Sequence, residues 1–447
     1  MTTPGAPARH RQRELVPARQ RPEAYTRALG RTVARVDMRE THISWLFFAG
    51  DRVFKVKKPV DLGFLDFSTR ERREHFCREE LRLNRRLAGD VYIEVLPITR
   101  EPDGTLVVGG AGEVEDWAVE MVRLPDAFML DRLLDEGTVD NQLIERLARL
   151  LVEFHRKADT GPGVDEHGAP EAVTANLRDT LDELEPFAAD AQDTPDSGLR
   201  VISSALLAFL RLRVERALAT HADTLRRRVE QGRIRDGHGD LHAANICAQP
   251  DRLVAYDCIE FTPRFRCGDV AADLAFLAMD FDLRGFRGFS RYLVRRYAAL
   301  SGDDGLLELM GLYKTYRALV RAKVECLRAR EASSGSEQRD AAVTHARHYA
   351  FLAATYHLPA GLVLTCGLPG SGKSTLAQQI SPAFEALVLR SDVRRKQLAG
   401  LPPSTRARAE FGTGLYPPEA IDHTYQVLLD EAITALEDVY VLEIEEH

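Results

Sequence analysis

A short glycine-rich motif is the feature that most limits what this chain can fold into. Residues 367–374 read Gly-Leu-Pro-Gly-Ser-Gly-Lys-Ser, after the apolar run 362–366 and before a segment of helical pattern at 375–380. Glycines at these positions let backbone N–H groups turn inward around a phosphate, and the helix N-terminus adds its partial positive charge. The motif therefore predicts a strand, a phosphate-binding loop and a helix, the opening unit of an α/β P-loop domain.

The same motif assigns roles to its side chains. We expect Lys373 to reach the β- and γ-phosphates of ATP and the Ser374 hydroxyl to bind Mg²⁺. The other residues of the predicted ATP site are Gly367, Gly370, Ser371, Gly372 and Thr375. The alternative is a glycine-rich turn without a ligand, and the strand and helix on either side favour the phosphate site.

A second group of polar residues lies well upstream of the glycine-rich motif. His238-Gly-Asp240-Leu-His-Ala-Ala-Asn245 is followed by the short apolar run 253–256 and then by Asp257. A loop would bring Asp240 and Asn245 together, and the returning strand would deliver Asp257 opposite them. A single Asp or Asn in a loop is more often a turn former or a helix cap. Three such residues at this spacing favour a phosphotransferase centre.

Each of these three residues has a chemical role in such a centre. Asp240 is expected to accept or orient the proton of an attacking hydroxyl. Asn245 and Asp257 offer the oxygen ligands that Mg²⁺ prefers. Phosphoryl transfer depends on positioning and charge neutralisation more than on covalent chemistry.

The N-terminal part of the chain contains the candidates for holding the ATP phosphates. Lys55 and Lys57 lie on one face of the strand predicted at 52–57, because strand side chains alternate between faces. Glu80 faces inward on the following predicted helix, where a small register change would exchange it with Glu79. We favour Lys55, paired with Glu80, as the phosphate lysine, and Lys57 stays a candidate.

These residues resemble the aminoglycoside phosphotransferase-like branch of the kinase fold. The segment from His238 to His242 replaces the His-Arg-Asp of protein kinases, and Asp257-Cys-Ile-Glu-Phe261 replaces Asp-Phe-Gly. The segment 268–275 resembles the helix that follows in that family, whose acidic residue braces the catalytic loop. The resemblance covers roughly residues 25–330. It implies a two-lobed fold that uses ATP and Mg²⁺.

The chain departs from this family in two places. No glycine-rich loop is recognisable before Trp45. The segment 57–68 is unlike the drug-modifying members. These departures keep open a regulator that binds ATP without turnover.

The residues after the glycine-rich motif are similar to small P-loop kinases, including gluconate and polynucleotide kinases. The resemblance covers 387–395 and implies that Asp392 serves as a base toward a hydroxyl, with the following Arg holding substrate. A helix N-cap is an equally good interpretation of Asp392. A strand is expected at 439–442, and only a few charged residues follow it, so the module is expected to be shortened or completed by another protomer.

The predicted fold class is an α+β kinase-like two-lobed domain followed by a shortened α/β P-loop NTPase-type domain. The expected parts are a disordered Arg- and Pro-rich tail at 1–24, an N-lobe at 25–123, a helical C-lobe with the catalytic loop at 124–335, a connecting helix at 336–357 and the P-loop domain at 358–447.

Composition narrows the partners and the compartment. The net charge of −8, with both signs mixed along the 447 residues, gives no support for a nucleic-acid-binding surface. The six cysteines form no C-x-x-C pair, which argues against a zinc site or a disulfide framework and fits the reducing cytoplasm. No apolar run reaches the roughly 20 residues of a membrane span. The oligomeric state stays open.

The expected activity is ATP-dependent phosphotransfer to the hydroxyl of a small molecule, with a C-terminal P-loop module that binds ATP. The alternative is a nucleotide-sensing regulator in which both modules bind ATP and neither turns it over. A protein kinase is disfavoured, because no Ala-Pro-Glu-like anchor follows Asp257.

Overall fold

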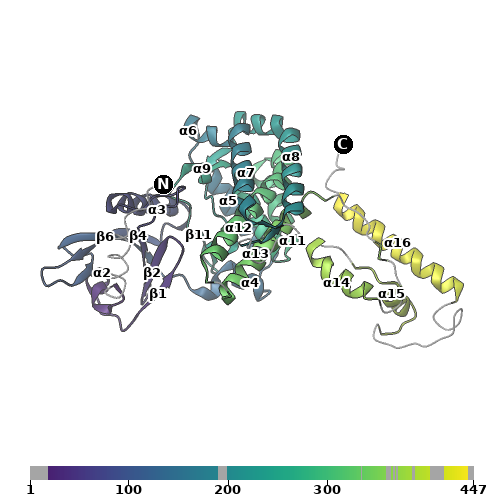
Figure 1. Ribbon diagram of the computed structural model, residues 1–447, viewed down its shortest axis with the longest axis horizontal. Helices are drawn as coiled ribbons and strands as arrows, with labels where there is room; N and C mark the ends of the chain where they lie inside the picture. The colour runs from purple at the N-terminus through teal and green to yellow at the C-terminus, as the bar shows by residue number, and fades with distance from the viewer. Residues whose placement is uncertain are drawn as a thin grey trace. The chain divides into compact units, whose positions relative to one another are not determined.

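The chain folds into two compact units, Met1–Tyr349 and Ala350–His447 (Figure 1). The computed structural model describes residues 19–189, 199–333, 335–358, 364–365, 368, 371–384, 388–402 and 417–440. The division lies inside helix α13 (Glu337–Thr355), which occupies the place of the expected connecting helix. The two units are described separately below.

The N-terminal lobe of the first unit is built on an antiparallel six-stranded sheet. Its strand order is β1-β2-β3-β6-β4-β5. The strands are β1 (Val36–Glu40), β2 (Ser44–Ala49), β3 (Arg52–Lys57), β4 (Tyr92–Arg100), β5 (Leu106–Val108) and β6 (Glu113–Val122). The hairpin between β2 and β3 turns at Gly50, whose φ of 65° suits glycine. β3 lies between β2 and β6, so both of its edges are paired.

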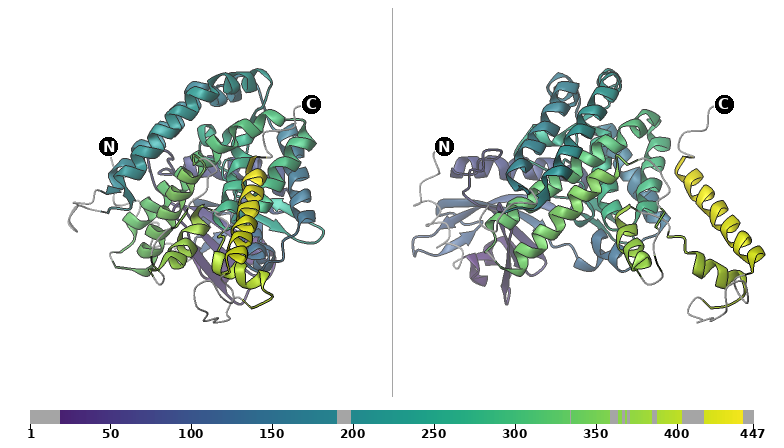
Figure 2. Two further views of the ribbon diagram at one scale, coloured as in Figure 1. Left: turned by 90° about the vertical axis from the view of Figure 1, so that its right-hand side faces the viewer. Right: turned by 45° about the vertical axis from the view of Figure 1, so that its right-hand side comes forward.

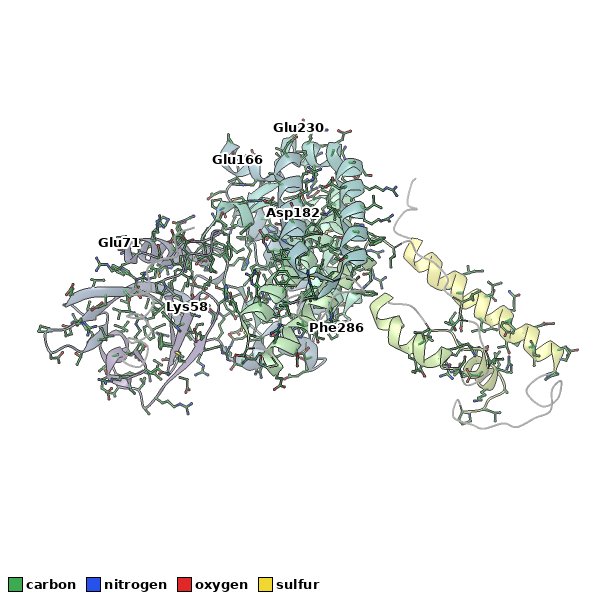
Figure 3. The ribbon with its side chains drawn as sticks, viewed as in Figure 1. Lys58, Glu71, Glu166, Asp182, Glu230 and Phe286 are labelled. Carbon is green, nitrogen blue, oxygen red and sulfur yellow. The ribbon has the colours of Figure 1, made fainter. Side chains whose placement is uncertain are left out.

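Helix α3 (Arg70–Ala88) packs against β4 and β6 of this sheet. Thr69 caps its first turn by accepting a hydrogen bond from the backbone N–H of Arg72 at 3.2 Å. Cys77, Glu80 and Leu83 are buried at helical spacing, so Glu80 faces into the lobe. Figure 3 labels Lys58, which directly follows β3, and Glu71, which lies in the first turn of α3.

Residues 19–24, which the sequence placed in a disordered tail, pack on this lobe. The Arg19 side chain is buried and its Nη2 lies 3.0 Å from Asp116 Oδ2. The Tyr25 hydroxyl donates a hydrogen bond to the Arg19 carbonyl at 2.6 Å. Asp116 is itself fully buried and also binds Arg73 of α3 at 2.8 Å. The ordering therefore has a physical cause, because a buried carboxylate requires cationic partners.

The C-terminal lobe is mostly helical and is centred on α10. Its main helices are α4 (Leu130–Asp135), α5 (Asn141–Lys157), α7 (Pro170–Leu184), α8 (Ser204–Glu230), α10 (Val270–Leu283), α11 (Arg287–Ser301) and α12 (Met310–Glu331). Figure 2 shows α8 as the longest of them. Residues 270–282 of α10 are buried on every side, and α10 packs against α11 and α12. A helix buried all round forms the core of a lobe.

Two small antiparallel pairs carry the loops of interest beside α10. Strand β9 (Ile234–Asp236) pairs with β12 (Cys267–Asp269), and β10 (Ile246–Ala248) pairs with β11 (Leu253–Ala255). The segment from His238 to Asn245 connects β9 to β10, and Asp257 follows β11. This arrangement delivers the motif residues from opposite sides, as their spacing suggested.

The described residues of the second unit form three further helices, α14 (Lys373–Phe384), α15 (Ser391–Leu398) and α16 (Pro418–Tyr440). Val439 and Tyr440, expected to begin a strand, belong to α16, so that prediction is wrong for these two residues. No Gly or Pro interrupts the sequence between 419 and 440, and the helical pattern continues. Residues 364–365 and 388–390, the described parts of two other expected strands, are not in strands.

Among the described residues, no helix combines the length and the apolar character needed to cross a membrane. Five cysteines are described, and all five are buried and unpaired. A cytoplasmic location stays a prediction.

A buried ion-pair cluster fixes the start of α10. Arg228 of α8 is 1% exposed and binds both oxygens of Asp269 at 2.6 and 2.7 Å. The same guanidinium binds Asp303 at 2.7 and 2.9 Å. Asp269 also caps α10 by accepting from the Ala271 N–H at 2.9 Å. Arg228 therefore links α8, α10 and the segment that precedes α12.

We expect Arg228→Met to lower the free energy of unfolding by about 3–5 kcal/mol, because it removes the cation that binds two buried carboxylates at hydrogen-bonding distance. Urea unfolding measures the change. Arg227→Met, at a neighbouring half-exposed position, should cost less than about 1 kcal/mol. Equal, small losses in both variants would contradict this account of the cluster.

Candidate active site

The loop between β9 and β10 holds Asp240 and Asn245 against each other. The Asn245 amide nitrogen donates to the Asp240 backbone carbonyl at 3.0 Å and to Asp240 Oδ2 at 3.1 Å. His242 Nε2 lies 3.4 Å from the same carboxylate oxygen. Because the Asn245 nitrogen is engaged with Asp240, its amide oxygen is the end available to a cation.

Two aspartates of α10 hold the backbone of this loop. Asp273 accepts hydrogen bonds from the backbone N–H groups of His238 at 2.6 Å and Gly239 at 2.8 Å. Two turns further along α10, Asp280 accepts a hydrogen bond from the backbone N–H of Ala243 at 2.8 Å. Gly239 has a φ of 82°, and a Cβ there would lie 2.8 Å from a backbone oxygen. Asp273 thus occupies the bracing position that the family resemblance implied.

His238 and His155 both support the catalytic loop from inside the lobe. His238 Nδ1 accepts from the Asp240 N–H at 3.3 Å, and its Nε2 lies 3.1 Å from the Tyr256 carbonyl. This pattern fits a neutral ring that donates from Nε2, and burial lowers the pKa of His238 accordingly. His155 Nε2 lies 3.4 Å from Asp273 and supports the bracing carboxylate.

A chain of alternating charges crosses from the sheet to the segment after β11. Lys55 Nζ lies 2.5 Å from Asp257 Oδ1 and 2.8 Å from Glu80 Oε1. Lys57 Nζ lies 2.7 Å from Glu80 Oε2 and also binds Glu260. The two lysines therefore share one glutamate, one oxygen each. Lys55 reaches the half-exposed Asp257, whereas Lys57 is fully buried behind it.

The electrostatics keep this chain ionised. Burial would raise the pKa of Glu80, but Lys55 and Lys57 outweigh it and lower the pKa to about 2. Burial would lower the pKa of Lys55, but Asp257 and Glu80 raise it well above its usual value. Glu260 is the exception, since burial raises its pKa and the charge of Lys57 only partly offsets that.

The base candidate is also ionised. Burial would raise the pKa of Asp240, but His242 and Arg321 outweigh it and hold the pKa below its usual value. A carboxylate is the form that can accept a proton from a hydroxyl.

Asp257 has an unusual backbone conformation. Its φ of 64° is the only positive φ at a non-glycine position in the described part of the chain. Such conformations cost energy and cluster at functional sites. Its N–H donates to the Tyr92 hydroxyl at 3.2 Å. Its side chain binds Lys55 and is 45% exposed to solvent. The turn therefore presents a carboxylate that a further ligand can reach.

The donor set at this position fits a hard cation. Asn245 supplies an amide oxygen and Asp257 a carboxylate, and both suit Mg²⁺. Among the described residues, no group of three or more His, Cys, Asp or Glu side chains could hold a metal ion alone. Mg²⁺ commonly binds through one or two carboxylates together with phosphates and waters, so two protein ligands are sufficient.

The turn between β1 and β2 contains no glycine, in line with the departure noted in the sequence. It reads Thr-His-Ile at 41–43. His42 Nδ1 lies 2.9 Å from Glu331 Oε2 at the end of α12, and Lys58 binds the Thr41 carbonyl. This turn is therefore linked to the C-terminal lobe through side chains.

Residue Glu260 and the link made by Arg86 are the features that sequence reasoning missed. Glu260 is 7% exposed and binds the buried Lys57. Arg86 of α3 donates to the carbonyls of Asp236 at 2.6 Å and Gly237 at 2.8 Å, just before the catalytic loop. The position of Arg86, three residues after the inward-facing Leu83 on the same helix, was the available signal.

The P-loop motif is described from Ser371 onward, together with Leu368; Gly367 and Gly370 lie outside the described residues. Gly372 has a φ of 87°, which suits glycine. Lys373 begins α14, and its Nζ donates to the Leu368 carbonyl at 2.7 Å. Ser374 and Thr375 follow in the first helical turn and are exposed.

Asp392 lies in the first turn of α15 and is half-exposed. Its carboxylate binds Arg390 at 2.9 and 3.2 Å, and its side chain does not cap the helix. The neighbouring Arg394 binds Glu431 of α16.

A cavity of about 30 Å³ lies on the far side of the catalytic loop. Its lining includes His155, Gly237, Arg264, Asp273 and Arg317. A volume of this size holds water molecules and no substrate. The cavity therefore belongs to the bracing of the loop.

Comparison with known proteins places the chain. A family model described as an AAA domain matches residues 362–440. The uncharacterized protein Rv2004c of Mycobacterium tuberculosis is 33% identical over 400 residues, which cover 89% of this chain and 75% of that protein. The uncharacterized protein Mb2027c of Mycobacterium bovis matches with the same values. The chain belongs to the family of these mycobacterial proteins.

Several solved structures are similar to most of the chain. A choline/ethanolamine kinase family protein from Mesorhizobium loti has a TM-score of 0.45 and 14% identity, covering 79% of this chain and 93% of its own. Plasmodium vivax ethanolamine kinase has a TM-score of 0.41 and 12% identity, covering 72% and 84%. Amicoumacin kinase hAmiN, in complex with AMP-PNP, Ca²⁺ and Ami, has a TM-score of 0.42 and 12% identity, covering 71% and 88%.

The fusion that the sequence indicated is confirmed. The first unit has the kinase-like division into a sheet lobe and a helical lobe, and the AAA match covers the P-loop module.

The depressed pKa of Glu80 predicts a pH dependence of stability. A carboxyl whose pKa falls from 4.5 to about 2 on folding contributes stability above pH 4.5 and loses it as the pH falls toward 2. We expect Glu80→Gln to be less stable than wild type at pH 6, by on the order of 3 kcal/mol. The difference should narrow between pH 4.5 and pH 3 in urea unfolding.

Glu79→Gln is the matched control, because Glu79 is adjacent in the chain but only partly buried, with Arg82 as its partner. Its difference from wild type should stay below about 1 kcal/mol across this range. A Glu80→Gln difference that does not change with pH would contradict the assignment.

Proposed function

We propose that this family member is an ATP-dependent phosphotransferase that acts on the hydroxyl of a small molecule. The observation that supports the proposal is that Asn245 contacts Asp240 and is hydrogen-bonded through its backbone to Tyr256, next to Asp257, which binds Lys55. Phosphoryl transfer requires a cation, a lysine that contacts the phosphates and a base in one site. The proposed acceptor is a small hydroxylated metabolite. A drug is not inferred from the drug-modifying relatives of the fold, since fold alone does not fix the substrate.

In the proposed reaction, the acceptor oxygen attacks the γ-phosphorus of ATP and ADP leaves. Asp240 accepts the hydroxyl proton as the new P–O bond forms and the bond to the ADP oxygen breaks. Lys55, oriented by Glu80, contacts the phosphates and offsets the charge that develops on the leaving group. Lys57 is proposed to position Glu80 and Glu260, because it is too deeply buried to contact a nucleotide.

Asn245 and Asp257 would hold Mg²⁺. The bound ion supplies neutralisation of the phosphate charge during transfer. Asp240 and Asn245 lie in a loop whose backbone is held by α10, and Asp257 follows the strand β11 that pairs with β10 at the end of this loop. These contacts fix the loop and the strand before substrate binds.

We assign a second ATP site to the P-loop module. Lys373 would leave the Leu368 carbonyl for the β- and γ-phosphates, and Ser374 would bind the accompanying Mg²⁺. Gly367, Gly370, Ser371, Gly372 and Thr375 complete this proposed site. Asp392 is retained as a base candidate of this module, although its carboxylate is bound to Arg390.

A second candidate function is an ATP-sensing regulator without turnover. The glycine-free turn at 41–43 and its link to Glu331 favour it, because a phosphate-covering loop normally needs a close backbone approach to the nucleotide. The two functions differ in a measurable way. Under the regulator hypothesis, Mg-ATP raises the melting temperature and no acceptor consumes it.

We expect Asp240→Asn to reduce acceptor-dependent ADP formation by about a hundredfold or more, because the amide cannot accept the proton. Mg-ATP should still raise the melting temperature of the variant, since Asp240 is not assigned to the nucleotide. Asp251→Asn, at an exposed turn before β11, serves as the control and should keep full activity. Undiminished turnover in Asp240→Asn would remove Asp240 from the mechanism.

Nucleotide stoichiometry tests the second site. Equilibrium dialysis with a non-hydrolysable ATP analogue should give about two nucleotides per wild-type chain and about one for Lys373→Ala, which lacks the P-loop ammonium. Lys396→Ala, on α15, should bind as wild type does. One nucleotide in the wild type, unchanged in Lys373→Ala, would exclude the P-loop site.

A further inference from the structure

An arginine of α12 lies beside the proposed base. Arg317 of this helix donates to the Gly239 carbonyl at 3.1 Å, and Gly239 directly precedes Asp240. Residues four apart lie on the same face of a helix, so Arg321 follows Arg317 along the face that meets the catalytic loop. Arg321 therefore lies on the Asp240 side of α12.

The contacts of Arg321 leave its charge available. Its Nε lies 3.4 Å from the Tyr349 hydroxyl, and its Nη2 lies 3.6 Å from Glu325 Oε1. The first distance is long for a hydrogen bond, and the second is that of a loose ion pair beyond hydrogen-bonding range. Glu325 makes its closer contact, 2.8 Å, with Arg328. A guanidinium with five N–H donors and two long contacts can still bind an anionic group.

The guanidinium is also held in place. Its carbon lies 5.6 Å from the centre of the Tyr349 ring, in a cation–π arrangement, and the side chain is 19% exposed. Arginine stacked on an aromatic ring is pre-organised for a planar carboxylate or for a phosphate. Arg321 therefore has the features of a binding residue that faces a substrate.

The acidic side chains of α10 on this side are already engaged. Asp280 accepts from the Ala243 N–H at 2.8 Å, and Asp282 binds Lys314 at 2.8 Å. His242, whose ring lies 5.8 Å from that of Phe276, is the other basic group beside Asp240. An ammonium group would meet basic residues here, whereas an anionic group would be complementary to them.

We propose that Arg321 forms a subsite for an anionic group, a carboxylate or a phosphate, carried by the acceptor whose hydroxyl meets Asp240. This inference rests on the proposed phosphotransferase function and names the acceptor class. Arg321 binds the acceptor and takes no part in proton transfer. It determines specificity through the charge of the acceptor.

Acceptors matched in skeleton and differing in charge test the subsite. Two sets are glucose, glucosamine, glucuronate and glucose 6-phosphate, and glycerol, serinol, glycerate and glycerol 3-phosphate. ADP formation by the full chain with Mg-ATP gives kcat/KM for each compound. The carboxylate or the phosphate member should exceed the neutral and amine members, and the better of the two identifies the anion.

Three variants isolate the effect of Arg321. Arg321→Met should lower the ratio of anionic to neutral kcat/KM by about tenfold or more, through the KM of the anionic acceptor, with KM for ATP unchanged. Arg321→Lys should retain part of the preference because it keeps the charge. Arg328→Met is the control, since Arg328 also binds Glu325 but is 55% exposed, and it should leave the ratio unchanged.

The ratio of anionic to neutral kcat/KM isolates the subsite. An indirect effect of Arg321 on Asp240 would change kcat/KM for every acceptor by the same factor and would cancel in the ratio. Preference for the amine members, or a ratio that is the same in wild type and Arg321→Met, overturns the subsite while the phosphotransferase function stands. Binding of Mg-ATP without turnover of any compound overturns the phosphotransferase function, and with it this subsite.

Discussion

The site depends on one buried chain of charges, Asp257–Lys55–Glu80–Lys57–Glu260. Its members come from a strand, a helix and the segment after β11, so the chain joins the sheet lobe to the catalytic lobe. Three carboxylates share two ammonium groups, which leaves one negative charge in excess if all are ionised. Asp257 is the half-exposed end of this chain, whereas Glu260 at the other end is buried. A divalent cation with a triphosphate is the ligand that the exposed end is suited to receive.

The second constraint is the way helix α10 holds the catalytic loop. Asp273 and Asp280 bind backbone N–H groups at both ends of the loop, and the helix that carries them is buried on every side. A buried carboxylate that accepts backbone hydrogen bonds is costly to displace. The loop geometry is therefore fixed by the core of the lobe, and Asp240 and Asn245 need no ligand to be placed. The charge chain and the bracing helix together describe a site that is assembled before the nucleotide binds.

The sequence predicted the parts of this site that short motifs carry. Asp240, Asn245 and Asp257 follow from spacing along the chain, and Lys55 and Lys57 from strand alternation. The division of roles between the two lysines did not follow, because it depends on Glu260. Glu260 is buried three residues after the left-handed turn at Asp257, which contacts Tyr92 and Lys55. Arg321 was missed for a similar reason, since its place beside Asp240 comes from the packing of α12 on α10. In the second unit, Val439 and Tyr440 continue α16, because nothing in the local sequence ends that helix.

The central claim is that Asn245 and Asp257 bind the divalent cation that accompanies ATP in the first unit. Electron paramagnetic resonance of Mn²⁺, titrated with a non-hydrolysable ATP analogue, measures this directly when the P-loop site is removed by Lys373→Ala. The account predicts one tightly bound, nucleotide-dependent Mn²⁺ in that background and its loss when Asp257→Asn is added. Disappearance of all nucleotide-dependent Mn²⁺ binding in Lys373→Ala alone would contradict it.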